Sequence, residues 1–564
     1  MAGREPVTSP SRWRTIVRLL TVGAIVAVVA AQAQPRPAET PTFGRLLPGT
    51  TIEFSLLLEF DDRGLRRHVS TLDDPRSPRP RRSLRPSEIG RRFGVSAASL
   101  ADLQRELNAS GIRVVRIYPQ RTAVRARGPL HAVERLFRVA LREHFTVDGV
   151  RYRAPVATPT IPRSLRRVVA GVLGLDTEPR QRPAAHLPSG VALGPIDAAT
   201  AYGILPLRDL GIDGSGVTIA IGSFSTFPRS GTDDLKAFDG EFEISGPAPR
   251  TEEVAGGTAD VHLELSLDID VIRAVAPKAQ IVVYEAPNSD DGVLAIFQEI
   301  AASKNGITIV SYSWGRCDSG LEAKYREAIE RELRIIAAER GINVFVASGD
   351  AGAYDCQRTD FANHDLAVNF PADSPSVISV GGTLLSTRSD GSYLREVAWE
   401  DPLSNGGGGG GINPVAEEPS WQKEYAPLPE REGRRGVPDV SAAASPASPW
   451  WVYDSGGWLA VGGTSAAAPF WAASLALIEQ YAAKKGIRRP LCFVAPLLYE
   501  IAASNERRRA FRDVTRGGNR HYDAGPGWDF ATGLGSPHVY NLAQALVELL
   551  ERDATRSCAD RLKD

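Results

Sequence analysis

The stretch Gly462-Gly463-Thr464-Ser465-Ala466-Ala467-Ala468-Pro469 decides how this chain is interpreted. It predicts a turn followed by a helix, which Ser465 opens and which continues through Trp471 and Leu475. The backbone N–H of Ser465 and the positive end of such a helix both favour a developing negative charge. Ser465 is therefore a candidate nucleophile.

A glutamate is the candidate base. A serine hydroxyl needs a positioned group to remove its proton, and a glutamate can do so. The run from about Asp260 to Ala276 predicts a helix on which Glu264 and Asp268 share one face. Asp268 could orient Glu264, and the pair should share a proton. The alternative is a solvated helix face. His262 faces elsewhere on the helix, and we interpret it as a surface residue.

A third carboxylate follows a predicted buried strand. The apolar run Ile342–Ala347 ends in Ser348-Gly349-Asp350, and α/β folds place reacting groups at such turns. A carboxylate cannot donate a hydrogen bond, so Asp350 would have to be protonated to stabilise an oxyanion beside the Ser465 N–H. Acid pH would then be required. The alternative is that Asp350 only caps a turn.

In chain order, Glu264, Asp268, Asp350 and Ser465 resemble the catalytic set of the sedolisins, the serine-carboxyl peptidases. The serine turn is similar to that of subtilases, but a subtilisin-type enzyme needs a His-Gly-Thr setting, and no histidine here is followed by Gly-Thr. The resemblance implies a subtilisin-like α/β fold, a parallel sheet with helices on both faces. It also implies that Ser465 is the nucleophile, Glu264 the base that Asp268 orients, and Asp350 the oxyanion donor.

The resemblance covers nearly all of the chain after about residue 190. It implies that Ser313, Trp314 and Gly315 bind substrate. Further matching blocks are Asn369–Ala372, Val380–Thr383, Gly436–Ser441, Ala524–Asp529 and Thr532–Gly535. In some sedolisins a second glutamate and a tryptophan extend the catalytic hydrogen bonds. Trp314 matches the tryptophan, but the strand Val217–Phe224 has no glutamate, so we expect an incomplete extension.

The C-terminal third carries a candidate site for one calcium ion. Asp513 and Asp529 supply carboxylates, and the loops supply carbonyls, the hard oxygen ligands that calcium prefers. The resemblance implies side-chain ligation by both aspartates and backbone ligation at Val514, Gly525 and Gly527. The alternative is a pair of ordinary Asx turns.

Composition describes a globular chain of more than one domain. It has 564 residues, 43% of them hydrophobic, and a net charge of −1, with nothing that suggests nucleic acid. No lysine precedes Lys236, and arginine outnumbers acid between Arg63 and Arg182, while carboxylates gather later. A basic segment facing an acidic one suits a bound, inhibitory propeptide. An arginine-rich solvated surface would look the same.

The N-terminus predicts export. Arginines precede an apolar run over Leu19–Ala31, and Ala31-Gln32-Ala33 offers a cleavage site, which defines a signal peptide over 1–33. An uncleaved anchor is the alternative. No later stretch should cross a membrane. Four cysteines fit an exported protein, and Cys317 and Cys356 should lie at neighbouring strand ends and could form a bridge. Whether Cys492 and Cys558 pair stays open.

A propeptide or activation domain is expected over residues 34–176. After a strand at Thr51–Leu56 and a loop to about Arg85, Ser96 should cap a helix that buries Leu100, Leu103 and Leu107. Strands at Ile112–Tyr118 and Thr122–Arg127, a helix at Ala132–Ala140 and a strand at about Glu143–Tyr152 follow. This βαββαβ order predicts a ferredoxin-like module, and it resembles the sedolisin activation domain.

An exposed linker with the maturation site is expected over 177–194, and the peptidase domain over 195–564. Strands near Val217, Ile281, Ile307 and Val344 alternate with helices, as in a parallel sheet. The glycine run Gly406–Gly411 has no phosphate-loop signature, and we interpret it as a flexible surface loop near the cleft.

We therefore interpret the chain as a secreted (extracellular or periplasmic), self-activating, acid-acting serine endopeptidase. Its expected partners are polypeptide substrates and its own propeptide, which would act as inhibitor and chaperone, and we expect a monomer. A tripeptidyl-peptidase of the same family would share every motif and differ in closure of the cleft beyond the third subsite. An inactive family member that acts as a binding protein is the third alternative.

Overall fold

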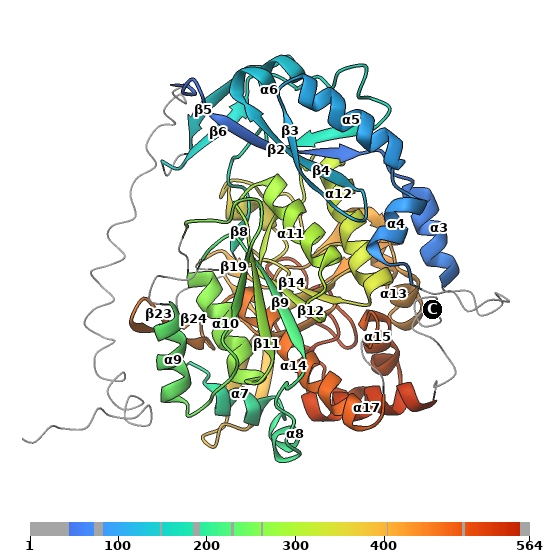
Figure 1. Cartoon of the computed structure of the whole chain (residues 1–564). Helices are drawn as coiled ribbons and strands as arrows, with labels where there is room; N and C mark the ends of the chain where they lie inside the picture. Colours follow the sequence, from blue (N-terminus) through green and yellow to red (C-terminus); the bar gives the residue numbers. More distant parts are fainter. Residues whose placement is uncertain are drawn as a thin grey trace, which may run out of the picture.

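The computed structural model describes residues 44–72, 83–146, 149–183, 192–226, 231–260, 263–402, 404–487 and 491–552. The predicted signal peptide, His262 and Cys558 lie outside these residues. A smaller N-terminal unit lies over helices α11 (Asp290–Ala302) and α12 (Ala323–Arg334) of a larger α/β unit, as Figure 1 shows.

The N-terminal unit is built on a four-stranded antiparallel sheet in the order β3-β4-β2-β7. Helices α5 and α6 pack on it through a shared apolar core. The elements are β2 (Thr51–Leu58), α5 (Ala97–Ala109), β3 (Arg113–Ile117), β4 (Ala123–Pro129), α6 (Leu130–Phe137) and β7 (Val169–Leu173). The βαββαβ order of a ferredoxin-like module is confirmed. So is the α5 N-cap, because the Ser96 hydroxyl accepts a hydrogen bond from Ser99 N at 3.0 Å.

Two details of this unit were wrongly predicted. The fourth strand of the sheet is β7, whereas the expected strand at Glu143–Tyr152 is a hairpin of β5 (Leu141–Phe145) and β6 (Arg151–Pro155). That hairpin pairs with β1 (Gly44–Arg45) in a separate sheet, because its mostly polar residues cannot fill the core. The expected loop to Arg85 instead contains α3 (Asp62–Leu72), and α4 (Pro86–Arg92) follows. Leu65 and Ile89 anchor these helices in the core.

The larger unit has an eight-stranded sheet in the order β10-β11-β9-β12-β14-β16-β17, with β22 also paired to β16. All pairs are parallel except β16 with β17. The strands are β9 (Thr218–Ser223), β10 (Arg250–Glu253), β11 (Gln280–Glu285), β12 (Ile307–Tyr312), β14 (Asn343–Ala347), β16 (Ile378–Thr387), β17 (Tyr393–Ala398) and β22 (Val440–Ala443). The predicted α/β fold class is confirmed.

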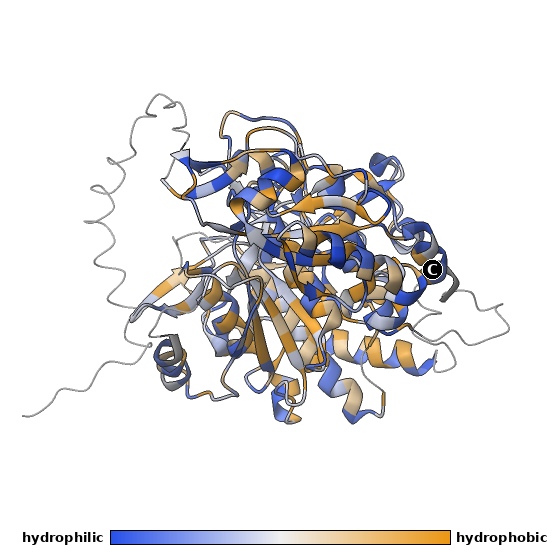
Figure 2. Ribbon diagram, turned by 45° about the horizontal axis from the view of Figure 1, so that its top comes forward, coloured by the Kyte–Doolittle hydropathy of each residue, from blue (hydrophilic) through white to orange (hydrophobic). Residues whose placement is uncertain are grey.

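Helices cover both faces of this sheet, and alternate strand residues divide between the two faces. One set, including Ile219 and Ile309, packs on α10 (Leu263–Val275) and α14 (Thr464–Lys484). The other set, including Ala220 and Val310, packs on α11 and α12, and the same apolar cluster continues into the N-terminal unit through Leu57. Hydrophobic colour accordingly runs through the centre of the ribbon in Figure 2. Helix α14 is buried from Thr464 through Ala482, as expected of a helix at the centre of a domain.

The two units also meet through charged groups. The Arg125 guanidinium of the N-terminal unit donates to Asp291 at 2.7 Å, and both side chains are buried. Arg116 pairs with Glu299 at 2.7 Å. In both pairs the N-terminal unit supplies the arginine and the larger unit supplies the carboxylate, as the uneven charge distribution predicts. Arg331 and Asp62 pair with the opposite polarity, so the interface is not simply basic against acidic.

The described parts of the linker, residues 177–183 and 192–194, are not exposed as we expected. Residues 177–183 are intermediate or buried, and Arg182–Pro183 forms a short strand, β8, antiparallel to β13 (Trp314–Cys317). On the other side of residues 184–191, Leu193 bridges to Trp450 in β23 (Trp450–Asp454). Backbone pairing with the larger unit explains the burial.

The glycine run is also not a surface loop. Residues Gly406–Gly411 are buried, and Gly406–Gly407 forms β19, which pairs with β18 (Glu400–Asp401). Gly409 N donates to Gly349 O at 2.7 Å. A Cβ atom on Gly409 would lie 1.9 Å from the Ser348 carbonyl oxygen. The glycines are needed because the backbone passes directly against the Asp350 turn.

The remaining elements complete the larger unit around this sheet. They are α7 (Pro195–Ala201), α8 (Leu205–Asp209), α9 (Gly231–Glu241), β15 (Asn369–Phe370), β20 (Gly411–Glu417), α13 (Ser420–Tyr425), β21 (Arg434–Val437), β24 (Gly457–Val461), α15 (Ala495–Ala503), α16 (Arg507–Ala510), β25 (Phe511–Arg512), β26 (Ser536–Pro537) and α17 (Val539–Arg552). A π-helical turn and two 3₁₀ turns lie at Ile335–Glu339, Asp355–Arg358 and Pro429–Arg431. Within the described ranges, none of the helices has both the length and the apolar character that a bilayer crossing requires.

Candidate active site

Ser465 lies in the first turn of α14, and its side chain is fully buried. The turn before it needs glycine, since Gly463 has a φ of 122°, a conformation that other residues rarely adopt. The Ser465 hydroxyl donates to the Ser313 carbonyl oxygen at 3.3 Å. The predicted helix start at the candidate nucleophile is therefore present.

Glu264 and Asp268 lie one helical turn apart on α10, and both side chains are fully buried. This burial excludes the solvated helix face. The Glu264 carboxyl lies beside Ser465, where the candidate base should be. Burial, and secondly the nearby Asp268, raises the pKa of Glu264 well above its ordinary value. Burial likewise raises the pKa of Asp268, against a hydrogen bond from Ser313 that lowers it.

Ser313 connects the two helices that carry these groups. Its hydroxyl donates to Asp268 Oδ1 at 2.6 Å and lies 3.4 Å from the Ser465 carbonyl oxygen. From sequence, Ser313 was predicted only as part of a substrate-binding strand. Its contact with Asp268 depends on how β12 ends beside α10, and no local sequence signal reports that.

Asp350 lies in the turn after β14 and faces the first turn of α14. Its Oδ1 atom accepts hydrogen bonds from Thr464 N at 2.8 Å and Thr464 Oγ1 at 2.7 Å. The Asp350 carbonyl accepts from Gly407 N at 3.0 Å. Asp350 thus does cap a helix start, and that helix carries Ser465.

Thr464 is a site residue that our reading of the sequence passed over. Its hydroxyl also contacts the backbone of Gly349, at 3.2 Å to both the nitrogen and the oxygen. Thr464 therefore connects the Asp350 turn to the turn before Ser465 by hydrogen bonds. Its position directly before Ser465 was the sequence signal that could have identified it as a site residue.

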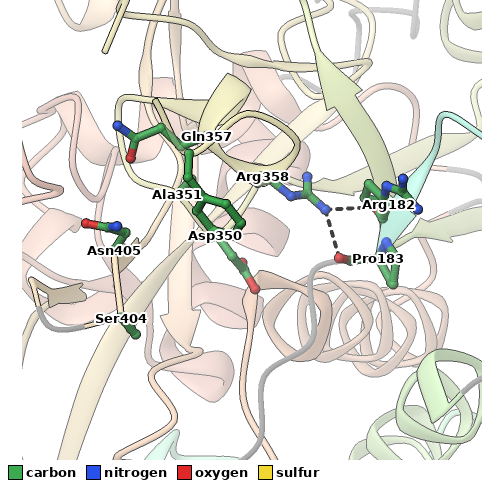
Figure 3. A pocket seen from close by; sticks show the side chains of 9 residues that line it. Arg182, Pro183, Asp350, Ala351, Gln357, Arg358, Ser404 and Asn405 are labelled. Carbon is green, nitrogen blue, oxygen red and sulfur yellow. Dashed lines mark hydrogen bonds between the residues drawn. The ribbon is translucent and has the colours of Figure 1, made fainter. Parts of the chain in front are cut away.

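The predicted substrate strand is covered by the linker. Trp314 pairs with Pro183 and Gly315 with Arg182, antiparallel, as two chains of a β-ladder. The Arg358 guanidinium donates to the carbonyl oxygens of Arg182 and Pro183, each at 2.8 Å. Figure 3 shows these two bonds at the edge of a pocket of about 240 Å³ whose wall includes Asp350. The linker therefore lies where the resemblance places a substrate.

The disulfide predicted between Cys317 and Cys356 is present. It joins the end of β13 to the short 3₁₀ turn Asp355–Arg358, which carries Arg358. The prediction for Cys492 and Cys558 depends on Cys558, which lies outside the described residues.

Strand β9 contains no glutamate, and its end packs against aromatic rings. A side chain at Gly222 would begin 2.8 Å from the ring of Tyr312, so the tyrosine ring fills that space. Tyr312 and Trp314 both pack against Phe224, with ring centroids 6.4 and 5.4 Å away. Aromatic rings thus surround Trp314 on the side of β9.

The candidate calcium residues lie around one loop. Gly527 N lies 3.2 Å from both carboxylate oxygens of Asp513, and Gly525 N donates to Asp529 Oδ2 at 3.1 Å. Burial raises the pKa of Asp529 to about 6, against hydrogen bonds from Gly525 and from the Thr532 region that lower it. A bound cation would favour the ionised form of so buried a carboxylate, and the hard oxygen donors fit calcium.

Two observations limit this fit. Arg507 donates to Asp513 Oδ1 at 2.8 Å and would compete with a cation. In the part of the chain that the structure describes, no group of three or more His, Cys, Asp or Glu side chains is arranged for a metal. Calcium here would depend on two carboxylates and backbone carbonyls.

Comparison with known proteins agrees with this geometry. Residues 42–178 match the family model "Pro-kumamolisin, activation domain", and residues 252–491 match "Subtilase family". The chain is 34% identical over 505 residues to kumamolisin from Bacillus sp. (strain MN-32), which covers 84% of this chain and 87% of the relative. The chain belongs to the sedolisin family. It is a serine-carboxyl peptidase with an activation domain, made as a zymogen.

Two further relatives match this chain over nearly its whole length. Sedolisin from Pseudomonas sp. (strain 101) is 26% identical over 584 residues, covering 96% of this chain and 98% of the relative. Tripeptidyl-peptidase 1 from Bos taurus is 26% identical over 567 residues, covering 92% and 95%. A solved structure of Pseudomonas sedolisin with two molecules of pseudo-iodotyrostatin matches with a TM-score of 0.56 at 26% identity. It covers 65% of this chain and 99% of that one. Among these relatives, release of tripeptides is represented by name.

Proposed function

We propose that this sedolisin is a secreted, acid-acting endopeptidase that processes its own linker. The observation that carries the proposal is the joint burial of Glu264, Asp268, Ser313 and Ser465 in one hydrogen-bonded group, with the linker paired across it. An inactive binding protein would have no need of a base held on its serine.

Each group has a distinct role in the proposed mechanism. Ser465 Oγ attacks the peptide carbonyl carbon while Glu264 removes the hydroxyl proton, which it then gives to the leaving amine. Asp268, held by the Ser313 hydroxyl, orients Glu264. The oxyanion accepts hydrogen bonds from the Ser465 N–H and from the acid form of Asp350. Water then hydrolyses the acyl-enzyme by the same proton path.

Endopeptidase activity is favoured over release of tripeptides by the course of the linker. Its described residues lie along the cleft on the side that leads to Pro183, and the chain is anchored again at Leu193. A cleft closed after three residues would not admit a chain of this length. Maturation would then cut the linker after Pro183 and before the anchored Leu193.

The test uses the full chain. Ser465→Ala should abolish both peptide hydrolysis and removal of the N-terminal unit, and Glu264→Ala should lower turnover by about a thousandfold or more because the serine loses its base. Both would be followed by mass spectrometry at several acid pH values. Self-processing in pure Ser465→Ala protein would refute the maturation mechanism, and normal turnover in Glu264→Ala would show that another base exists.

Calcium is a separate proposal. Asp513 and Asp529 would hold the ion with the carbonyls of Val514, Gly525 and Gly527, and the ion would stabilise the folded state, since it binds only that state. In the Ser465→Ala chain at about pH 7, a chelator should lower the melting temperature by several degrees. Asp513→Asn should remove this response. A melting temperature that a chelator leaves unchanged would remove the ion from this account.

A further inference from the structure

Gln181, the linker residue before Arg182, makes a second set of contacts with the peptidase unit. Asn288 Oδ1 accepts a hydrogen bond from Gln181 N at 3.0 Å, and Asn288 Nδ2 donates to Gln181 O at 2.9 Å. One side-chain amide thus satisfies both backbone polar groups of a single residue, as a neighbouring strand would. This contact involves only backbone atoms of residue 181, so it would accept any residue except proline, which has no N–H.

The side chain of Gln181 is also enclosed. Only 1% of it is exposed, and its Nε2 lies 3.4 Å from the Tyr325 hydroxyl. The Arg316 guanidinium covers the Tyr325 ring, 4.5 Å from its centroid, and holds the ring in place. Gln181 therefore occupies a formed polar pocket on the peptidase unit.

The register of β8 fixes which substrate position this pocket serves. Pro183 lies opposite Trp314, and Ser313, the residue before Trp314, has its carbonyl oxygen 3.3 Å from Ser465 Oγ. A substrate in the same register would place its next residue opposite Ser313 and present that residue's carbonyl to Ser465. Counting back from the scissile bond, Pro183 marks the second position, Arg182 the third and Gln181 the fourth.

We propose that Asn288 and Tyr325 form a specificity site for the fourth residue before the scissile bond, where Asn288 binds the backbone and Tyr325 favours an amide side chain. The inference rests on the proposed function of Ser465. The natural occupant in the zymogen is Gln181, and in the mature enzyme it is a polypeptide that extends at least four residues before the cut. The site gives a physical reason for an endopeptidase.

The test compares substrates of two lengths on the mature enzyme. N-acetylated peptides with three or four residues before the scissile bond, glutamine being the fourth, would differ in kcat/KM by about tenfold. The longer peptide gains two neutral hydrogen bonds, one from its fourth N–H to Asn288 and one from its glutamine side chain to Tyr325. At about 0.5–1.5 kcal/mol each, these bonds support a ratio of that order. In Asn288→Ala the advantage of the longer peptide should fall to about threefold. The three-residue peptide should also lose a fewfold in kcat/KM, because its acetyl carbonyl takes the place of the Gln181 carbonyl that Asn288 binds. An unchanged melting temperature shows that the variant is folded.

Side-chain selection is tested separately. Tyr325→Phe should reduce the preference for glutamine over leucine at the fourth position by a fewfold and leave the three-residue peptide unaffected. An Asn288→Ala variant that keeps the full length advantage would overturn the proposal, as would a wild-type preference for three-residue peptides with a free amino terminus. If wild type cleaves neither peptide, the proposed function itself fails, which is a distinguishable outcome.

Discussion

Ser313 shows how much one residue can add to a proposed triad. It lies between α10 and α14, and its hydroxyl and carbonyl contact Asp268 and Ser465 respectively. Removing a hydrogen bond to a carboxyl usually costs about 1.5–3 kcal/mol, because the buried acceptor is left unsatisfied. The position of Asp268, and through it that of Glu264, therefore depends on a residue that the sequence indicated only as part of a substrate strand.

The proposed role of Asp350 makes a prediction at the same scale. Its acid form is needed as a donor, so activity should fall on the alkaline side as it ionises and repels the developing oxyanion. Asp350→Asn supplies a donor that does not titrate, at nearly the same size. We expect a peak kcat/KM about tenfold or more below wild type, because an amide N–H donates a weaker hydrogen bond to the oxyanion than a carboxylic acid does, together with a weaker alkaline decline. Thr464 can still donate its two hydrogen bonds to the amide oxygen.

The measurement is the pH profile of kcat/KM for both enzymes on one peptide. Thr464→Ser, which keeps the hydroxyl that contacts Asp350, serves as a matched control and should preserve the wild-type profile. Superimposable limbs for wild type and Asp350→Asn would mean that another group sets the alkaline decline.

Elements were predictable where a single local pattern decides them. Helix α5 follows from Ser96 and three buried leucines, and the buried strands β9, β12 and β14 follow from apolar β-branched runs. Strand β7 was missed because its choice as the fourth strand depends on pairing with β2, about 110 residues earlier in the chain. The glycine run was misassigned because composition alone does not distinguish a flexible loop from backbone under close packing.

That packing gives a prediction for one glycine. A methyl group at Gly409 would lie 1.9 Å from the Ser348 carbonyl oxygen, so Gly409→Ala must shift the Asp350 turn. We expect a loss of at least about 1–3 kcal/mol in the free energy of unfolding, and a fall in kcat. Gly240→Ala is the matched control, because nothing lies within 4 Å of its Cβ position on α9 and alanine favours a helix. Equal free energies of unfolding for the two variants would show that the glycine run can move to accept a methyl group at Gly409.

At the scale of the whole molecule, buried carboxyls lie behind the active site. The carboxyl of Asp373 is fully buried, and burial raises its pKa to about 7 although Arg326 lies 3.1 Å away. Burial raises the pKa of Asp355 to about 6, with Arg358 acting in the opposite direction. Asp355 lies in the 3₁₀ turn that carries Arg358, the residue that donates to the linker carbonyls.

These shifts predict that the fold is more stable in acid than at neutral pH. An unfolded aspartate ionises near pH 4, whereas folded Asp373 keeps its proton up to about pH 7. Between these values the folded state binds more protons, so the free energy of unfolding falls as pH rises, by up to about 1.4 kcal/mol per pH unit for each such group, and levels off above pH 7. Urea unfolding of the Ser465→Ala chain, which cannot digest itself, would measure this slope between pH 4 and 8. Asp373→Asn, whose amide does not titrate, should show a shallower slope; an unchanged slope would mean that Asp373 is ionised throughout.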